Sequence, residues 1–303
     1  MSVNTMPSTP LAGRITDPIL LEVLSRYTKT SPETVDDLLA ACIENDLPKF
    51  RARFDDWASS GYDVHELADV MREAVCRNNV EIVSMLLSHG QSPEASYATD
   101  AVRHRAKDVL AVFLQNGWDI NGCPAQGRPP VLGLAVHDED MATWLLDRGA
   151  DPNQQSLIDL TPTSVAVKEA PLSTIKLFFD RGADVNKGQL LHHAVERDSG
   201  EAGVVAFLLE KGAAINAKMY ENHPVSFGLY CMMGIGTPLH FAAQAGKYGL
   251  VQYLLEKGAD PTIKDALDKT AMDWARFSGH ADVMGLLKIA MDKDGATAEA
   301  RDV

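Results

Sequence analysis

Runs of aliphatic residues that end in a glycine recur along most of the chain, as in VSMLLSHG, TWLLDRG and QYLLEKG. The closing glycines are Gly90, Gly117, Gly149, Gly182, Gly212 and Gly258. Their successive spacings are 27, 32, 33, 30 and 46 residues. Sixteen positions before four of these glycines stands a small residue: Ala74, Ala101, Ala166 and Ala242. This fixed spacing indicates an internal repeat, which decides the fold class before any other feature does.

One unit of the repeat predicts two short helices and a turn. Thr237 is a good helix N-cap, and Pro238 suits the first helical position, where no backbone donor is needed. The apolar positions of LVQYLLEK have helical spacing, and Gly258 can take the left-handed conformation that ends a helix. Two helices of this length cannot bury an apolar face alone, so we expect the units to stack side by side into a solenoid.

These residues resemble the ankyrin repeat family. GTPLHFAAQAGKYGLVQYLLEKGADPTIKD, from Gly236 to Asp265, follows the family pattern of TPLH, paired alanines, V-x-x-L-L and GAD. TPTSVAV, LLHHAV, RGADPN and RGADVN are partial copies. The resemblance covers about Thr34 to Met291 and implies an all-α ankyrin-repeat solenoid of about eight helix-turn-helix units, with β-turn fingers and a concave binding face. The first and last units are atypical, as the ends of a stack require.

The resemblance divides the chain into three segments. An N-terminal tail and capping helix are expected over 1–33, in which 16–29 has the cap and aliphatic spacing of one helix. The ankyrin repeat domain covers 34–291, and a flexible C-terminal tail covers 292–303. Some fingers depart from the family: Trp118 stands where Ala is usual, and Gln91 and Ser92 replace Ala-Asp.

A long insertion separates two well-kept units. Gly212 to Thr237 is 25 residues, whereas Gly258 to Thr270 is 12, so the connection carries thirteen extra residues within 217–236. Insertions in repeat arrays map to loops on one face, often the binding face. This one is rich in aromatic residues and methionine, which are enriched at recognition surfaces. Two readings stay open: the loop packs on its own groove as local core, or it is held ready for a partner.

Candidate binding residues follow from the insertion and the unusual finger. The anchors expected to contact a partner are Tyr220, His223, Phe227, Tyr230, Met232 and Met233, with Trp118 and Arg128 as lesser contacts. Trp57, Trp144 and Trp274 occupy apolar helix positions and are expected in the core. Asp151, Asp184 and Asp260 are expected to bond the local backbone of their turns.

Metal binding and catalysis find little support in the motifs. The histidines and the cysteine near the insertion lack HExxH or CxxC spacing, and His192 and His193 point about 100° apart on one helix. The resemblance implies that His192 and His240 bond neighbouring backbone. No GxSxG, GxxxxGK[ST] or strand-associated GxGxxG is present. We therefore expect no enzyme, catalytic residue, cofactor or metal.

Composition narrows the class of partner. Hydrophobic residues at 46% and charged residues at 23% are typical of a folded chain. The formal charge of −14 disfavours nucleic acid, and no run approaches the ~20 apolar residues of a membrane span. The start has no apolar core behind a basic flank, and the four cysteines are far apart, so the reducing cytoplasm or nucleus is expected.

Together these features predict a protein-binding scaffold or adaptor, expected to be a monomer, whose concave face, fingers and insertion hold a protein partner. The alternative is a small-molecule or catalytic site in which the insertion roofs a pocket beside His192 and His240. The alternative requires the aromatic side chains of the insertion to face inward over a cavity with convergent polar groups.

Overall fold

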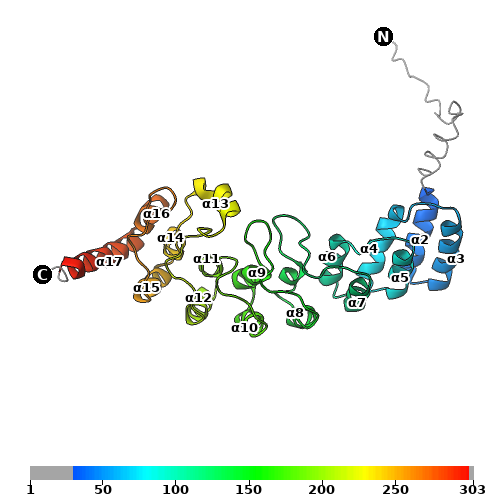
Figure 1. Ribbon diagram of the computed structural model, residues 1–303, viewed down its shortest axis with the longest axis horizontal. Coiled ribbons are helices and arrows are strands. Elements are labelled where there is room, and N and C mark those ends of the chain that lie inside the picture. Colours follow the sequence, from blue (N-terminus) through cyan, green and yellow to red (C-terminus); the bar gives the residue numbers. More distant parts are fainter. Residues whose placement is uncertain (1–29, 300–303) are drawn as a thin grey trace, which may run out of the picture. The chain divides into compact units, whose positions relative to one another are not determined.

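Short antiparallel helix pairs make up the protein, as the computed structural model of residues 30–299 shows; its side chains are described to Asp292 (Figure 1). The helix expected over 16–29 lies outside the described residues. Within the described range no β-strand occurs, and only two isolated bridges form, at 125–128 and 264–270. The chain divides into two units, 1–117 and 118–303.

The first unit contains three helix pairs. These are α2 (Pro32–Glu44) with α3 (Leu47–Ser59), α4 (Ala68–Cys76) with α5 (Val80–Ser88), and α6 (Ala95–Arg103) with α7 (Lys107–Gln115); the short 3₁₀ helix η2 (Val64–Leu67) leads into α4. The first helices α2, α4 and α6 contact one another in order, and α5 contacts α7. Phe50, Phe54 and Trp57 on α3 are buried, so Trp57 is a core residue, as predicted.

The second unit contains five pairs and the insertion. The pairs are η3 (Val131–Leu134) with α8 (Glu139–Leu146), α9 (Pro162–Glu169) with α10 (Leu172–Asp180), α11 (Leu190–Val195) with α12 (Glu201–Glu210), α14 (Pro238–Gln244) with α15 (Tyr248–Glu256), and α16 (Ala271–Ser278) with α17 (Ala281–Glu299). In Figure 1 the first helices α9, α11 and α14 form one row and the second helices α8, α10, α12 and α15 form the other. The eight pairs confirm the predicted repeat architecture.

Two boundaries differ from the sequence prediction. The first helix of the fourth pair is only a 3₁₀ turn, and it contains Gly133, a poor helix former. At the other end α17 continues to Glu299 and so enters the segment 292–303 that was expected as a tail. That segment begins DKDGATAEA, which contains no proline to stop a helix.

A recurring hydrogen bond joins the start of three first helices, α9, α11 and α14, to the next finger. The fourth residue of the TPLH position reaches a backbone carbonyl one repeat onward. Ser164 donates to the carbonyl of Gly188 at 2.6 Å, and the Nε2 atoms of His192 and His240 donate to the carbonyls of Gly236 (3.2 Å) and Lys269 (3.1 Å). His240 also caps its own helix, because its Nδ1 accepts from the backbone N of Thr237 at 3.1 Å. This confirms the structural role that the resemblance implied for the two histidines.

The fingers contain the predicted aspartate turns. Oδ1 of Asp151, Asp184 and Asp260 accepts from the backbone N two residues onward, at 2.8, 2.9 and 2.8 Å. These Asx turns satisfy backbone donors that the short connections would leave open. The aspartates therefore shape the fingers rather than form a reactive site.

Candidate partner-binding site

The insertion is fastened to the repeats at both of its legs. The backbone N of Met219 on the outgoing leg donates to the carbonyl of Gly236 on the returning leg at 2.9 Å. The same carbonyl accepts from His192, and the backbone N of Tyr220 donates to Oε1 of Gln189 at 3.1 Å. Because these bonds join backbone to neighbouring repeats, the legs belong to the rigid part of the second unit.

Between its legs the insertion folds into α13 (Pro224–Tyr230) and the 3₁₀ helix η4 (Cys231–Met233), not into an irregular loop. Pro224 occupies the first helical position, and Nδ1 of His223 accepts from the backbone N of Ser226 at 3.2 Å. Ser226 belongs to α13, and its side chain is fully buried. His223, predicted as a partner contact, thus has a capping role in this structure.

A cavity of about 810 Å³ lies beneath the insertion. The insertion supplies one wall, and the first helices α14 and α16 supply the opposite one. The lining residues are Glu196, Met219, Tyr220, Tyr230, Met233, Gly234, Ile235, Phe241, Gln244, Asp265, Leu267, Lys269, Asp273, Trp274, Arg276 and Phe277. Seven of these lining residues are aromatic or contain sulfur, and five are charged.

The aromatic part of the cavity is tightly organised. The ring of Trp274 meets the ring of Phe241 edge to face with centroids 5.3 Å apart, and it meets the ring of His240 in the same way. Nε1 of Trp274 donates to Oδ2 of Asp265 at 2.8 Å, and Oδ1 of Asp265 accepts two backbone N–H bonds. The carboxylate of Asp265 thus fixes both the finger and the indole ring.

Across the cavity, the rings of Tyr220 and Tyr230 stack with centroids 5.5 Å apart and an interplanar angle of 27°. Tyr220 has a left-handed backbone, with a φ of 60°, which turns its side chain toward Tyr230. Burial raises the pKa of Tyr220 to about 12, so its phenol stays neutral. The pair forms a flat, apolar surface with polar hydroxyl tips.

Glu196 lies at the C-terminal end of α11, where a carboxylate is unfavourable beside the negative end of the helix dipole. Two partners offset this cost: Oε2 of Glu196 lies 3.4 Å from Nδ1 of His193 and 3.2 Å from Nζ of Lys168. Hydrogen bonding to His193, with the charge of Lys168, lowers the pKa of Glu196 to about 2. The carboxylate is therefore ionised throughout the physiological range.

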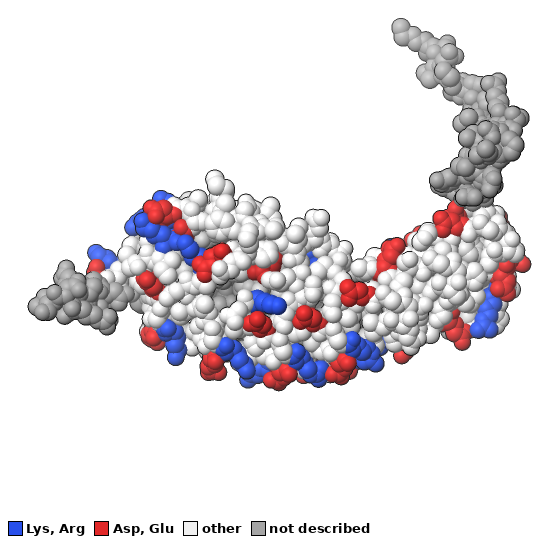
Figure 2. Space-filling model, in the orientation of Figure 1, with Lys and Arg blue, Asp and Glu red and all other residues white. Residues whose placement is uncertain are grey.

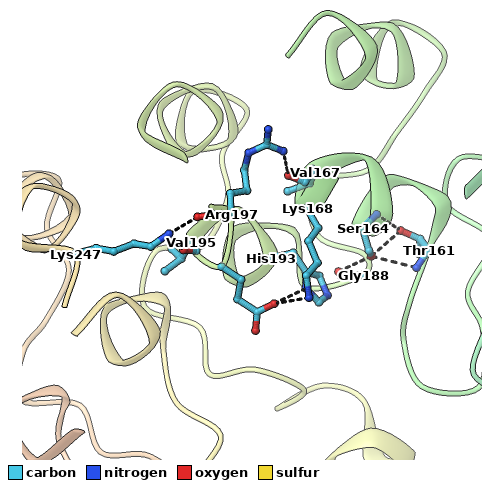
Figure 3. A network of polar contacts seen from close by, with 10 residues as sticks. Thr161, Ser164, Val167, Lys168, Gly188, His193, Val195, Arg197 and Lys247 are labelled. Atoms are coloured by element: carbon cyan, nitrogen blue, oxygen red, sulfur yellow. Dashed lines mark hydrogen bonds and ion pairs between the residues drawn. The ribbon is translucent and has the colours of Figure 1, made fainter. Parts of the chain in front are cut away.

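Cationic side chains also close the ends of the first helices (Figure 3). The guanidinium of Arg197 donates to the carbonyls of Val167 at 2.6 Å and Ala170 at 3.0 Å, in the last turn and at the C-cap of α9. The amino group of Lys247 donates to the carbonyls of Val195 and Arg197. These contacts hold the end of α11, and Glu196 with it, against both neighbouring repeats.

Large apolar side chains around the cavity remain exposed. Phe277 on α16 is 92% exposed, and Met232 and Met233 of η4 are 80% and 75% exposed. The segment 222–236 contains no Lys, Arg, Asp or Glu. In Figure 2 the surface over α13 is accordingly uncharged, whereas acidic and basic side chains alternate along the edge formed by the second helices. Exposed large apolar side chains gathered around a cavity are typical of a binding site.

The predicted anchors fall into two groups. Tyr220, Tyr230 and Met233 come together as the inward wall of the cavity. Phe227 and Met232 are exposed on the insertion and do not line the cavity. The legs and tyrosines of the insertion pack on the repeats, whereas Phe227 and Met232 are exposed. The binding role of these residues remains a prediction.

The two lesser contacts lie elsewhere. Trp118 is only 9% exposed, so the expectation of an accessible finger tryptophan is wrong. Trp118 directly follows a helix-ending glycine. The residues at the equivalent position in two other repeats, Ala150 and Ala259, are also buried. Arg128 is exposed in the finger before η3 and is not among the residues that line the cavity.

Sequence reasoning missed the helix-borne half of the site. Trp274 was expected in the core but lines the cavity half-buried, and Trp144 is also half-buried, beneath the guanidinium of Arg148 at 3.8 Å. Aligning the repeats on their TPLH positions puts Phe241 and Trp274 at one equivalent site, and Gln244 and Phe277 at another. Aromatic residues at these groove-facing positions were the available signal.

The geometry gives no support to a metal or catalytic centre among residues 30–292. No group of three or more His, Cys, Asp or Glu side chains in that range is placed to hold a metal ion. Burial lowers the pKa of His192 to about 3, so its ring is neutral and serves as a backbone donor. Neither His192 nor His240 lines the large cavity. Of the helices that the structure describes, none combines the length and apolar character needed to cross a membrane.

Comparison with known proteins agrees with the architecture. A model of ankyrin repeats in three copies matches residues 132–219, and a model of ankyrin repeats in many copies matches residues 234–275. The chain is 30% identical over 217 residues to the ankyrin repeat protein nuc-2 of Neurospora crassa, and 30% identical over 153 residues to a putative ankyrin repeat protein of fowlpox virus. These alignments cover 62% and 49% of the chain, and the chain spans about a fifth of the length of each of these relatives.

A relative that the alignment covers over most of its length is the putative ankyrin repeat protein YahD of Escherichia coli. It is 25% identical over 186 residues, which make up 59% of this chain and 88% of that protein. Repeat motifs, paired helices, finger turns and family models all agree. Residues 132–219 and 234–275 are ankyrin repeats.

Proposed function

We propose that the protein is an adaptor or scaffold that binds a protein partner at the cavity beneath the insertion. Ankyrin repeats are generally protein-interaction modules, and the exposure of Phe277 beside an aromatic cavity is the observation that carries the proposal. Burying an exposed phenylalanine contributes about 1.5–3 kcal/mol to binding. An apolar side chain exposed to water is unfavourable, so a partner that covers Phe277 gains part of its affinity there.

Rigidity of the site supports the same proposal. Both legs of the insertion are hydrogen-bonded to the repeats, and the helix ends are capped by side chains of neighbouring units. A preformed site loses little conformational entropy on binding, so more of the contact energy appears as affinity. The methionines of η4 can meanwhile adjust their rotamers to the partner surface.

A small-molecule ligand is the second candidate. A volume of about 810 Å³ falls within the range of ~300–1,000 Å³ that ligand pockets occupy. Tyr220 and Tyr230 face inward, as this alternative requires, and charged groups converge on the same space. Against it, Met232 and Phe227 are exposed on the insertion outside the cavity lining, and a small ligand in the cavity would leave them uncovered.

A peptide selection tests the primary proposal. A phage library of random dodecamer peptides is selected on the wild-type chain, and the enriched peptides are titrated against Met233→Ala/Phe277→Ala. Both side chains are largely exposed, so the fold should be unchanged. We expect the double variant to lose about tenfold or more in affinity, as two truncated apolar contacts imply.

The matched control is Leu157→Ala/Ile289→Ala. It likewise truncates two exposed apolar side chains, but these lie outside the cavity lining. It should bind the selected peptides like the wild type. Failure to enrich any peptide, or equal affinity for wild type and the Met233/Phe277 variant, would contradict a peptide-binding groove at this place.

For the compartment, we propose the cytoplasm or the nucleus. All four cysteines, at positions 42, 76, 123 and 231, are unpaired thiols. Burial raises the pKa of Cys42 to about 11, which keeps that thiol protonated and unreactive. Free thiols are typical of reducing compartments. Fluorescence microscopy of a tagged chain tests this assignment, and accumulation in a secretory compartment would oppose it.

A further inference from the structure

One end of the cavity has the chemistry of a cation site. Glu196 lines it, and the contacts of this carboxylate with Lys168 and His193 both use Oε2. Within the described part of the chain, Oε1 of Glu196 accepts no hydrogen bond. A carboxylate has about four lone-pair sites, so an ionised, half-buried Glu196 retains acceptor capacity for one more charged donor.

The stacked rings of Tyr220 and Tyr230 line the same cavity as Glu196. A cation near the face of a tyrosine ring is attracted by the ring quadrupole, and more so where water is partly excluded.

From this juxtaposition we propose that the cavity binds a partner segment that carries an arginine beside a bulky apolar residue. The guanidinium lies against the Tyr220–Tyr230 pair and donates to the carboxylate of Glu196. The apolar side chain fills the end formed by Phe241, Trp274 and Phe277. This inference rests on the proposed function and names the chemistry of the partner.

Charge complementarity supports a cationic ligand over an anionic one. Three carboxylates line the cavity, from Glu196, Asp265 and Asp273, against two cations, from Lys269 and Arg276. Arg276 is already engaged by Asp273 at 2.7 Å. The whole chain has a formal charge of −14, which attracts a basic segment at long range and repels an acidic one.

Arginine fits better than lysine for a geometric reason. A planar guanidinium can stack on an aromatic face and still donate in its own plane to a carboxylate, whereas an ammonium group is a compact, strongly hydrated charge. The site offers both an aromatic face and a carboxylate. We therefore expect a segment with lysine to bind more weakly than one with arginine, and more strongly than one with a neutral isostere.

Small probes test the chemistry without a known partner. Benzoyl-arginine amide joins an aromatic ring to a guanidinium, and benzoyl-citrulline amide is its uncharged isostere. Each is titrated into ¹⁵N-labelled protein, and the amide shifts of residues around the cavity are followed. We expect saturable binding of the arginine compound in the range of about 1 mM, and at least about tenfold weaker binding of the citrulline compound.

Three variants separate the proposed contact from general electrostatics. Glu196→Gln should reduce the affinity for the arginine compound by about tenfold and remove the preference over citrulline. Lys168→Met removes the cation that competes for Glu196 and should raise the affinity about two- to fivefold. Glu210→Gln makes the same change of net charge on the second helix α12, outside the cavity lining, and should alter the affinity less than twofold.

The outcomes distinguish this inference from the proposed function. If arginine and citrulline compounds bind alike, if the arginine compound gives no saturable shift up to about 10 mM, or if Glu196→Gln and Glu210→Gln act equally, the arginine site is wrong. In the first and third cases, weaker binding of both probes to Phe277→Ala would leave the apolar groove standing. Circular dichroism and thermal midpoints of every variant confirm that the fold is retained.

Discussion

Asn153 and Asp184 join two consecutive repeats through their fingers. Oδ1 of Asn153 accepts from the backbone N of Asp184 at 2.7 Å, and its Nδ2 donates to the carbonyl of Gly182 at 2.8 Å. The same pair of bonds runs from Asn121 to the Gly149–Asp151 finger and from Asn216 to the Gly258–Asp260 finger. In these three fingers one asparagine side chain thus fixes the spacing to the following finger.

Replacing Asn153 with alanine should destabilise the second unit. Two hydrogen bonds of about 0.5–1.5 kcal/mol each are lost, so we expect the free energy of unfolding in urea to fall by about 1–3 kcal/mol. The half-buried backbone N of Asp184 would also lose its partner.

Asn186→Ala is the matched control for this prediction. Nδ2 of Asn186 bonds to Asp184 within its own finger, and among the described residues Asn186 has no hydrogen bond to the next finger. Its loss should cost less than about 1 kcal/mol. Equal destabilisation by the two alanine variants would show that the bridge between fingers contributes nothing.

The burial of His192 predicts a pH dependence. Burial lowers its pKa from 6.5 to about 3, so the unfolded chain takes up the proton first as the pH falls. The stability that the neutral ring permits is complete above pH 6.5 and is lost progressively between pH 6.5 and 3. The slope should approach about 1.4 kcal/mol per pH unit for this group.

His192→Gln isolates that contribution, because an amide keeps a donor for the Gly236 carbonyl but does not titrate. Urea unfolding above pH 5 is the informative measurement. Glu196, whose pKa falls from 4.5 to about 2, contributes stability that is present above 4.5 and lost only below it. The variant should have a shallower slope than the wild type, whereas the exposed His137→Gln should not. Identical slopes for all three proteins would contradict the assignment.

The repeat units could be predicted because their signals are local. The cap at Thr237, the glycine at Gly258 and the aliphatic spacing between them act within about twenty residues, so each pair of helices is specified by its own segment. Asp151 and its equivalents likewise bond two residues onward. Such features depend on neighbours along the chain and so appear directly in the sequence.

The cavity depends on contacts between distant segments and could be predicted only in part. The sequence identified the insertion and three of its inward residues, but the direction of each side chain follows from where the legs are fixed. Gln189 and Gly236 set that direction through bonds to Tyr220 and His192. The expected exposure of Trp118 was wrong for the same reason, because packing between segments decides its burial at a position that alanine usually occupies.

Close packing at Gly236 predicts a sensitive position. A Cβ added there would lie 2.5 Å from Cγ of His240, well inside contact distance, and the ring is held by bonds to Thr237 and Lys269. Gly236→Ala should therefore lower the free energy of unfolding by about 1–3 kcal/mol, as overpacking does. Differential scanning calorimetry would register this as a lower midpoint.

Gly228→Ala is its counterpart in the same insertion. A Cβ at Gly228 meets nothing within 4 Å, and the residue lies inside α13, where alanine is the better helix former. This variant should be neutral or up to about 1 kcal/mol more stable. A loss as large as that of Gly236→Ala would mean that the insertion tolerates no change anywhere, rather than being constrained at its leg.

Lys247 is expected to hold the short helix α11 in place. Its amino group donates to the carbonyls of Val195 and Arg197 from the next repeat, and α11 has only six residues to stabilise itself. Lys247→Met keeps the aliphatic stem and removes the donors. We expect a loss of about 1–3 kcal/mol and faster hydrogen exchange of the amides of α11.

The comparison that decides this role is Lys257→Met. Lys257 caps the end of α15, and its amino group lies 5.5 Å from the ring of Tyr253, an exposed contact that bonds no carbonyl of another repeat. Both substitutions remove one positive charge near a helix C-terminus, so dipole effects of about 0.3–1 kcal/mol are shared. The bonds between repeats are reported by the additional loss of unfolding free energy in Lys247→Met, together with faster hydrogen exchange confined to α11. Equal losses in the two variants would assign the contribution of Lys247 to its charge alone.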